Sequence, residues 1–159
     1  MKLWKNWFVP TLQIPSTPNA MGRIIALDIG DRRIGIATSD PLRMIASPHS
    51  VYTRIGWSKD IKHIKALFLE LEADYLLCGL PKNMDDSLGF QSEKVMQFCD
   101  MLRDHGMPIV YQDERLSTVC AHDALIEGNV SRQMRKSLVD KVAAAFILQS
   151  HLDENSQQL

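Results

Sequence analysis

The chain has 159 residues, of which 45% are hydrophobic and 23% are charged, and its formal net charge is −1. This length excludes two large domains, and the near-neutral charge restricts any nucleic-acid binding to a local basic patch. Three cysteines without C-x-x-C spacing exclude a disulfide framework or a zinc site. No apolar run reaches the roughly 18 residues of a membrane span. We therefore expect a cytoplasmic protein with no membrane partner.

Residues 1–21 differ in composition from the rest of the chain. Residues 1–20 include two of the three tryptophans, Trp4 and Trp7, and three of the seven prolines, but no acid. We expect a flexible extension or a translation start assigned too early, since Met21 directly precedes the first strand. An aromatic and basic arm that contacts nucleic acid is the alternative. The domain itself is expected over residues 22–153, with a disordered tail at 154–159.

Two short apolar runs open the domain. Residues 23–29 contain one acid, Asp28, and residues 34–37 follow after Gly30 and three charged residues. This pattern predicts two antiparallel strands joined by a tight turn. Residues 44–52 then predict a third strand.

The remaining elements alternate between helix and strand. Helical spacing of apolar residues covers 58–72, 91–105, 117–127 and 137–152, and continuous apolar runs at 74–80 and 108–112 are typical of buried parallel strands. The order predicts an α/β fold: a mixed five-stranded sheet, with an antiparallel three-strand meander and two parallel strands, covered by helices on both faces.

Acidic residues follow the strand ends at one predicted edge of this sheet. Asp28 ends the first strand, Asp113 and Glu114 end the last one, and Asp140 lies in the predicted first turn of the last helix. Converging carboxylates repel one another unless a cation neutralises them, and oxygen ligands select Mg²⁺ or Mn²⁺. Two such ions support phosphodiester hydrolysis. Neighbouring strand residues face opposite ways, so only one of Asp113 and Glu114 can point into the site. Asp140 is also explained by the helix dipole alone.

Basic residues accompany the acids. Residues 131–141 carry a net charge of +3, which suits a phosphate backbone but is also compatible with a solvated loop and helix start. Arg115 and Lys82 lie at the same predicted edge of the sheet. The bases of the 131–141 segment are Arg132, Arg135, Lys136 and Lys141.

Four motifs together resemble the YqgF family, a bacterial group described as Holliday junction resolvases or pre-16S rRNA nucleases with a ribonuclease H-like fold. They are DIGDRRIGIA at 28–37, GLPKNMD at 79–85, DERLST at 113–118 and DKVAA at 140–144. The resemblance implies metal-dependent phosphodiester cleavage with Asp28, Glu114 and Asp140 as metal ligands. It also implies substrate contacts from Arg33, Lys82 and Arg115. Asp86 departs from the family, which usually has glycine there.

Three functions remain as hypotheses. The first is an endonuclease that uses Mg²⁺ or Mn²⁺, as two ions, in maturation of the 5′ end of pre-16S rRNA. The second is a Holliday junction resolvase, which would cut branched DNA as a homodimer. The third is a non-catalytic RNA-binding factor in ribosome assembly.

Overall fold

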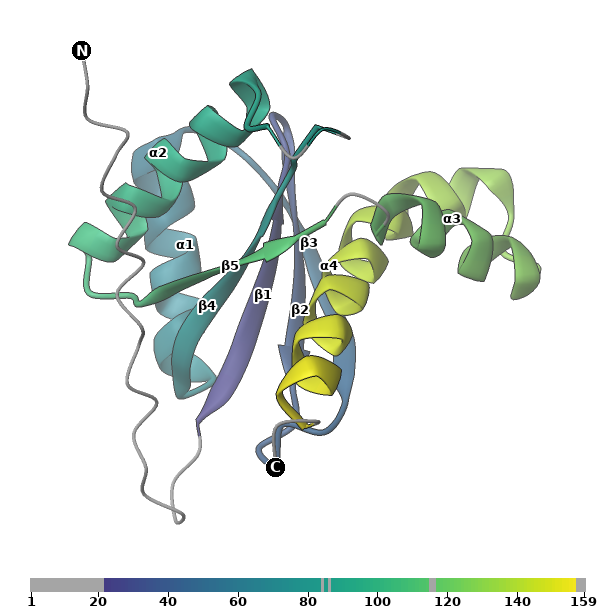
Figure 1. The fold of residues 1–159 in the computed structure, drawn as a ribbon, viewed down its shortest axis with the longest axis horizontal. Helices are drawn as coiled ribbons and strands as arrows, with labels where there is room; N and C mark the ends of the chain where they lie inside the picture. Colours follow the sequence, from purple (N-terminus) through teal and green to yellow (C-terminus); the bar gives the residue numbers. More distant parts are fainter. Residues whose placement is uncertain (1–21, 84, 86, 115–116, 157–159) are drawn as a thin grey trace.

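The computed structural model describes residues 22–83, 85, 87–114 and 117–156. Within these limits the elements follow one another along the chain as β1 (Arg23–Ile29), β2 (Arg33–Ser39), β3 (Ala46–Thr53), α1 (Trp57–Glu70), β4 (Ala73–Leu80), α2 (Phe90–Asp104), β5 (Ile109–Asp113), α3 (Ser117–Glu127) and α4 (Arg132–Ser156) (Figure 1). The extension expected at residues 1–21 and the end of the expected tail lie outside the described residues. In the part of the chain described, no helix is long and apolar enough to cross a membrane.

The strands form one mixed sheet in the order β3-β2-β1-β4-β5. Pairing is antiparallel from β3 through β2 to β1, and parallel from β1 through β4 to β5. This confirms the predicted meander with two parallel strands and places β1, the strand that carries Asp28, at the centre of the sheet.

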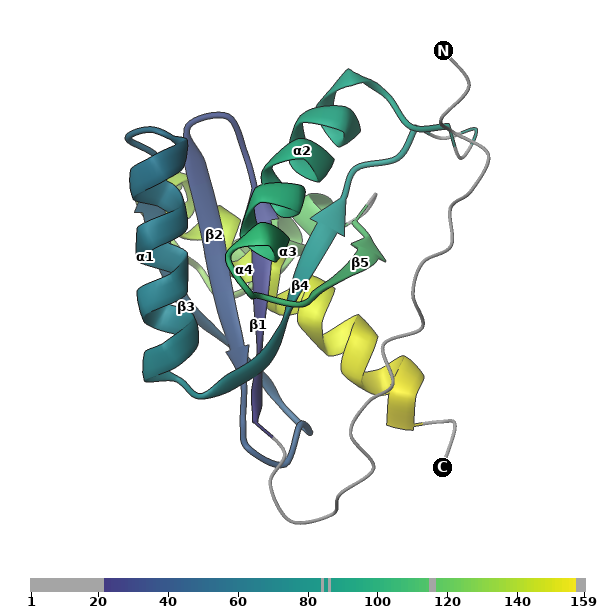
Figure 2. The same ribbon diagram turned by 90° about the vertical axis from the view of Figure 1, so that its left-hand side faces the viewer.

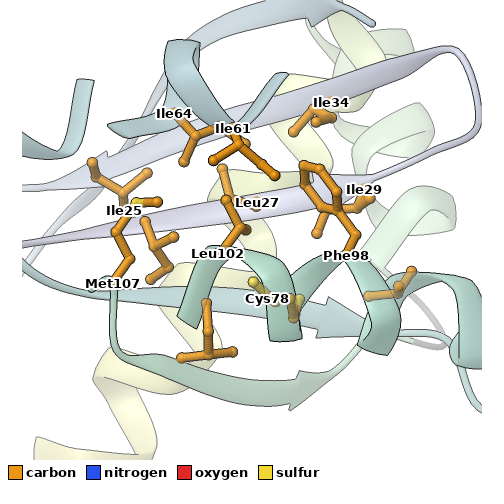
Figure 3. Close-up of a cluster of buried hydrophobic side chains, with 14 of the residues drawn as sticks. Ile25, Leu27, Ile29, Ile34, Ile61, Ile64, Cys78, Phe98, Leu102 and Met107 are labelled. Carbon is orange, nitrogen blue, oxygen red and sulfur yellow. The ribbon is translucent and has the colours of Figure 1, made fainter. Parts of the chain in front are cut away.

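Helices cover both faces of the sheet, as predicted. Helices α1 and α2 lie on one side, and α4, with α3 packed against it, lies on the other (Figure 1). The core beneath α1 and α2 contains Ile25, Leu27 and Ile29 of β1, together with Phe98 and Leu102 of α2 (Figure 3). Alternate residues of the same strand, Ile24 and Ala26, belong to the core beneath α4.

The last helix is longer than the sequence pattern predicted. It begins at Arg132 instead of residue 137, because Ser131 accepts hydrogen bonds at its start: its hydroxyl from the Met134 N–H (3.3 Å) and its carbonyl from the Arg135 N–H (2.9 Å). At the other end α4 continues through Ser156, so residues 154–156, assigned to the tail, are helical. The Ser156 hydroxyl bonds back to the Asp153 carbonyl at 2.8 Å.

Candidate active site

Strand alternation determines which face Asp28 occupies. Side chains at every second position of a strand share a face, so Asp28 lies with Ile24 and Ala26 on the α4 side of the sheet. Its direct neighbour on β2 is Gly35, with which it is paired in register. Asp28 is therefore a half-buried acid at the end of the central strand, beneath α4.

Helix α4 approaches the sheet closely at this point because Gly35 has no side chain. A Cβ atom at residue 35 would overlap the backbone carbonyl of Asp140 on α4. The absence of that atom lets the helix backbone lie directly on β2. Asp140 is thereby brought near Asp28, and the charge of Asp140 raises the pKa of Asp28, second in effect to burial.

Glu114 reaches the same place from the other side of β1. It follows β5, and the intervening strand β4 presents Gly79 on the α4 face, where a Cβ would overlap Oε2 of Glu114. The Glu114 side chain therefore lies over Gly79 and shares a hydrogen bond with the Asp28 carboxylate. Asp113 is exposed. Of the two adjacent acids, the structure brings Glu114 to Asp28.

Burial and mutual repulsion raise the pKa values of both partners in this pair. Burial, followed by the charge of Asp140, raises the pKa of Asp28 from 3.8 to about 6, although the hydrogen bond with Glu114 opposes the change. Burial, followed by the charge of Asp28, raises the pKa of Glu114 from 4.5 to about 8. Both changes favour a proton shared between the two carboxyl groups. Such a proton is one that a divalent cation can displace.

Arg33 forms an ion pair with the third acid. Its Nε atom lies 2.9 Å from Oδ2 of Asp140, and its Nη1 donates a 3.4 Å hydrogen bond to the Lys136 carbonyl one helical turn earlier. Asp140 is the ninth residue of α4, so its predicted place in the first helical turn is wrong. The helix dipole, which acts within the terminal turn, therefore does not explain this acid.

The predicted basic residues fall into distinct groups. Arg132 and Lys136 are exposed, and their spacing of four places them on the same side of α4 as Asp140. Lys141 is partly buried beside Asp140. Arg135 instead reaches back to the Val130 carbonyl at 2.8 Å, where it supports the α3–α4 turn.

Of the two remaining predicted contacts, Lys82 lies in a described loop, the one that follows β4. An antiparallel bridge between Lys82 and Leu88 closes this loop, and the Asn83 N–H donates a 2.9 Å hydrogen bond to the Ser87 carbonyl. Arg115 and the departure at Asp86 lie outside the described residues.

The donor chemistry of the three acids fits a hard cation. They offer only carboxylate oxygens, the ligands that Mg²⁺ and Mn²⁺ prefer. Oδ2 of Asp140 is buried and makes no aligned hydrogen bond, so its charge is balanced by the ion-pair contact with Arg33. Among the described residues, however, no three His, Cys, Asp or Glu side chains are grouped as a metal cage. Arg33 would therefore compete with a cation for Asp140.

The two glycines are the part of the site that sequence reasoning did not identify. Gly35 and Gly79 each stand at an inward-facing position of a buried strand, where glycine weakens the strand unless another group approaches closely. Each glycine lies two residues from a buried residue of the same strand, Gly35 from Ala37 and Gly79 from Leu77, and therefore on the same face of the sheet. This spacing is visible in the sequence and is the signal that could have identified them.

Comparison with known proteins places this chain in a family. Residues 22–154 match the RuvX family profile, described as Holliday junction resolvase. A protein of Clostridium acetobutylicum named "Putative pre-16S rRNA nuclease" is 47% identical over 132 residues, which cover 82% of this chain and 98% of the relative. A protein of Clostridium tetani with the same name is 50% identical over 132 residues, which cover 82% and 96%.

Solved structures share the fold at low sequence identity. The Thermus thermophilus RuvC bound to a Holliday junction superposes with a TM-score of 0.52 at 11% identity, covering 86% of this chain and 96% of RuvC. The fowlpox virus Holliday junction resolvase has a TM-score of 0.52 at 15% identity, covering 83% of this chain and 99% of the resolvase. The fold is therefore the predicted ribonuclease H-like type found in these nucleases. On the match over residues 22–154 and the identity to full-length relatives, the chain belongs to the RuvX (YqgF) family, as its four motifs predicted.

Proposed function

We propose that the protein is a metal-dependent endonuclease that hydrolyses phosphodiester bonds, with Asp28, Glu114 and Asp140 as its catalytic acids. The observation that carries the proposal is the half-buried Asp28–Glu114 pair beside Asp140, in which burial and mutual repulsion raise the pKa of both carboxyl groups. An arrangement of buried acids this costly is expected at a functional site. Nuclease relatives and nuclease-type neighbours support the reaction class.

The three acids would hold Mg²⁺ or Mn²⁺, as two ions, with Asp28 positioned centrally between the other two. Bound ions of this kind activate a water molecule and stabilise the departing oxygen of a phosphodiester. Binding of a cation would require loss of the proton shared by Asp28 and Glu114, and it would require Asp140 to part from the Arg33 guanidinium. Arg33 is then available to hold a non-bridging phosphate oxygen next to the scissile bond.

The basic face of α4 would guide the nucleic-acid backbone to the acids. Arg132 and Lys136 share the helix side of Asp140, and Lys141 adjoins it. Lys82, in the loop after β4, is proposed to contact the substrate, as is Arg115. Arg135 has a structural partner in the Val130 carbonyl, so its contribution to binding is smaller.

The substrate best supported is precursor 16S rRNA. The relatives with that name are 47–50% identical and aligned over nearly their full length. The family description and the RuvC likeness favour a second candidate, branched DNA cut by a homodimer. A third candidate, an RNA-binding assembly factor without catalysis, does not explain why the two acids are held together at this site.

One experiment separates these functions. Purified protein is incubated with precursor 16S rRNA and with a four-way DNA junction, each with Mg²⁺ and with chelator. We expect cleavage of the RNA with Mg²⁺ only, and loss of cleavage in Asp28→Asn with an unchanged circular dichroism spectrum. Glu127→Gln, at an exposed acid of α3, is the matched control and should cleave normally. Full activity in Asp28→Asn, or equal activity with chelator, would refute the metal assignment.

A further inference from the structure

A cavity of about 580 Å³ lies on the opposite side of the sheet from the acids, at the same end of β1. Its walls come from the β1–β2 turn, the loop before α1 and the N-terminal parts of α1 and α2, two helices that begin at the same end of the molecule (Figure 2). The volume is within the range of small-molecule sites, which is about 300 to 1,000 Å³. None of the residues proposed above for catalysis lines it.

Two exposed aromatic side chains line this cavity. Trp57 is the first residue of α1 and is 41% exposed, and Phe90 is the first residue of α2 and is 72% exposed. Trp57 is held edge-on against the buried Phe98 ring, with centroids 5.8 Å apart, and Lys94 lies 4.6 Å from the Phe90 centroid. Partly exposed aromatic rings held in place at one cavity form a surface on which nucleic-acid bases stack.

The charges that line the cavity favour a base over a phosphate. Arg54 is bound to the fully buried Asp60 at 2.9 Å, and Lys94 pairs with Asp31 at 3.4 Å, so both cations are already neutralised. Glu93 is the remaining charged residue of the lining, so the net charge of the lining is negative. A phosphate would be repelled, whereas the amino groups at base edges donate readily to carboxylates.

The cavity and the acids are connected by two consecutive residues of β1. Asp28 faces α4, and the next residue, Ile29, lines the cavity on the α1–α2 side. A nucleic-acid strand that crosses this end of the sheet would therefore meet both. Resting on the proposed nuclease function, we propose that this cavity receives an unpaired base of the substrate strand where that strand crosses this end of the sheet, with the base stacked against Trp57 and Phe90. The substrate class is then a strand with unpaired nucleotides near the cut site, in preference to a continuous duplex.

The test uses Trp57 as its own reporter. The sequence has three tryptophans, so Trp4→Phe and Trp7→Phe leave Trp57 as the single one. In that background, with Asp28→Asn and chelator present to prevent cleavage, the fluorescence is titrated with an unstructured RNA oligonucleotide and with a duplex of equal length. We expect saturable quenching by the unstructured RNA and little by the duplex. Phe90→Ala should weaken binding about tenfold, and Phe90→Tyr should restore it.

The control is Leu69→Ala, at the far end of α1, where the side chain is 65% exposed. It should bind RNA like the parent. Binding seen by anisotropy of labelled RNA without quenching of Trp57, or equal quenching by duplex, would overturn the base site and leave the nuclease proposal standing. If the single-tryptophan variant shows the expected quenching but the wild-type protein does not cleave RNA, the nuclease proposal is overturned and the base site stands.

Discussion

Replacing Glu114 by glutamine tests whether the buried acid pair is held together by a proton. The introduced amide can still donate a hydrogen bond to Asp28, so the contact is preserved while the second negative charge is removed. In the wild type the folded-state pKa of Glu114, about 8, lies above its ordinary value of 4.5. The folded state therefore keeps the proton over a range where the unfolded chain loses it. The stability associated with this proton is present below pH 4.5 and is lost as pH rises to 8.

The magnitude follows from the size of the pKa change. At about 1.4 kcal/mol for each pH unit, a rise from 4.5 to about 8 corresponds to roughly 4 to 5 kcal/mol once the pH exceeds 8. Some of this cost is shared with Asp28, so we expect the variant to be more stable than wild type by about 2 to 4 kcal/mol at pH 9. At roughly 2 to 4 °C for each kcal/mol, this raises the melting temperature by about 5 to 15 °C. At pH 5 the two proteins should differ little.

The measurement is urea denaturation with chelator at pH 5, 7 and 9, with Glu127→Gln as the exposed-acid control. Adding Mg²⁺ at pH 8 should stabilise the wild type more than the variant, because the cation replaces the shared proton. Stability that declines in parallel for wild type and Glu114→Gln between pH 5 and 9 would refute the assignment of the proton to this pair.

Three other changes probe the supports of the site. Gly35→Ala should destabilise the fold by about 1 to 3 kcal/mol and abolish cleavage, because its Cβ would displace Asp140; alanine at Gly128, whose added Cβ meets only ordinary contacts, should keep activity in the same assay. Arg33→Gln should lower the Mg²⁺ concentration for half-maximal cleavage and raise the KM for RNA, and an unchanged Mg²⁺ titration would contradict the competition for Asp140. Asp60→Ala should cost about 3 to 5 kcal/mol in urea denaturation, since it leaves the Arg54 guanidinium buried without its partner, and a loss below about 1 kcal/mol would contradict that account.

The sheet was predictable because its signals are local. Alternation and apolar runs identified each strand, and their order along the chain, a meander followed by two parallel strands, places the first strand at the centre. The same period of two places Asp28 with Ile24 and Ala26, so its face was available from the sequence as soon as a helix was assigned to that side. The start of α4 was predicted at the wrong residue because its sequence signal is a single serine, Ser131, which follows other turn-forming residues.

The close contacts of the site were not predictable from local patterns. The Arg33–Asp140 ion pair joins residues 107 positions apart along the chain and depends on the closeness of α4 to β2. The choice of Glu114 over Asp113 came from family resemblance, and the structure supports it through the hydrogen bond to Asp28. Trp57 and Phe90 each lie one residue before a helix predicted from the sequence, at 58–72 and 91–105, and the shared cavity relates them.

The alternation along β1 has a consequence for folding accuracy. A slip of the central strand by one residue would exchange the faces of Asp28 and Ile29 and drive a carboxylate into the apolar layer beneath Phe98. An unpaired buried acid costs several kcal/mol, so the misregistered sheet is penalised at its centre. The residue proposed to carry the chemistry thus also acts as a marker of strand register. Asp28→Leu, unlike Asp28→Asn, would remove that safeguard together with the activity.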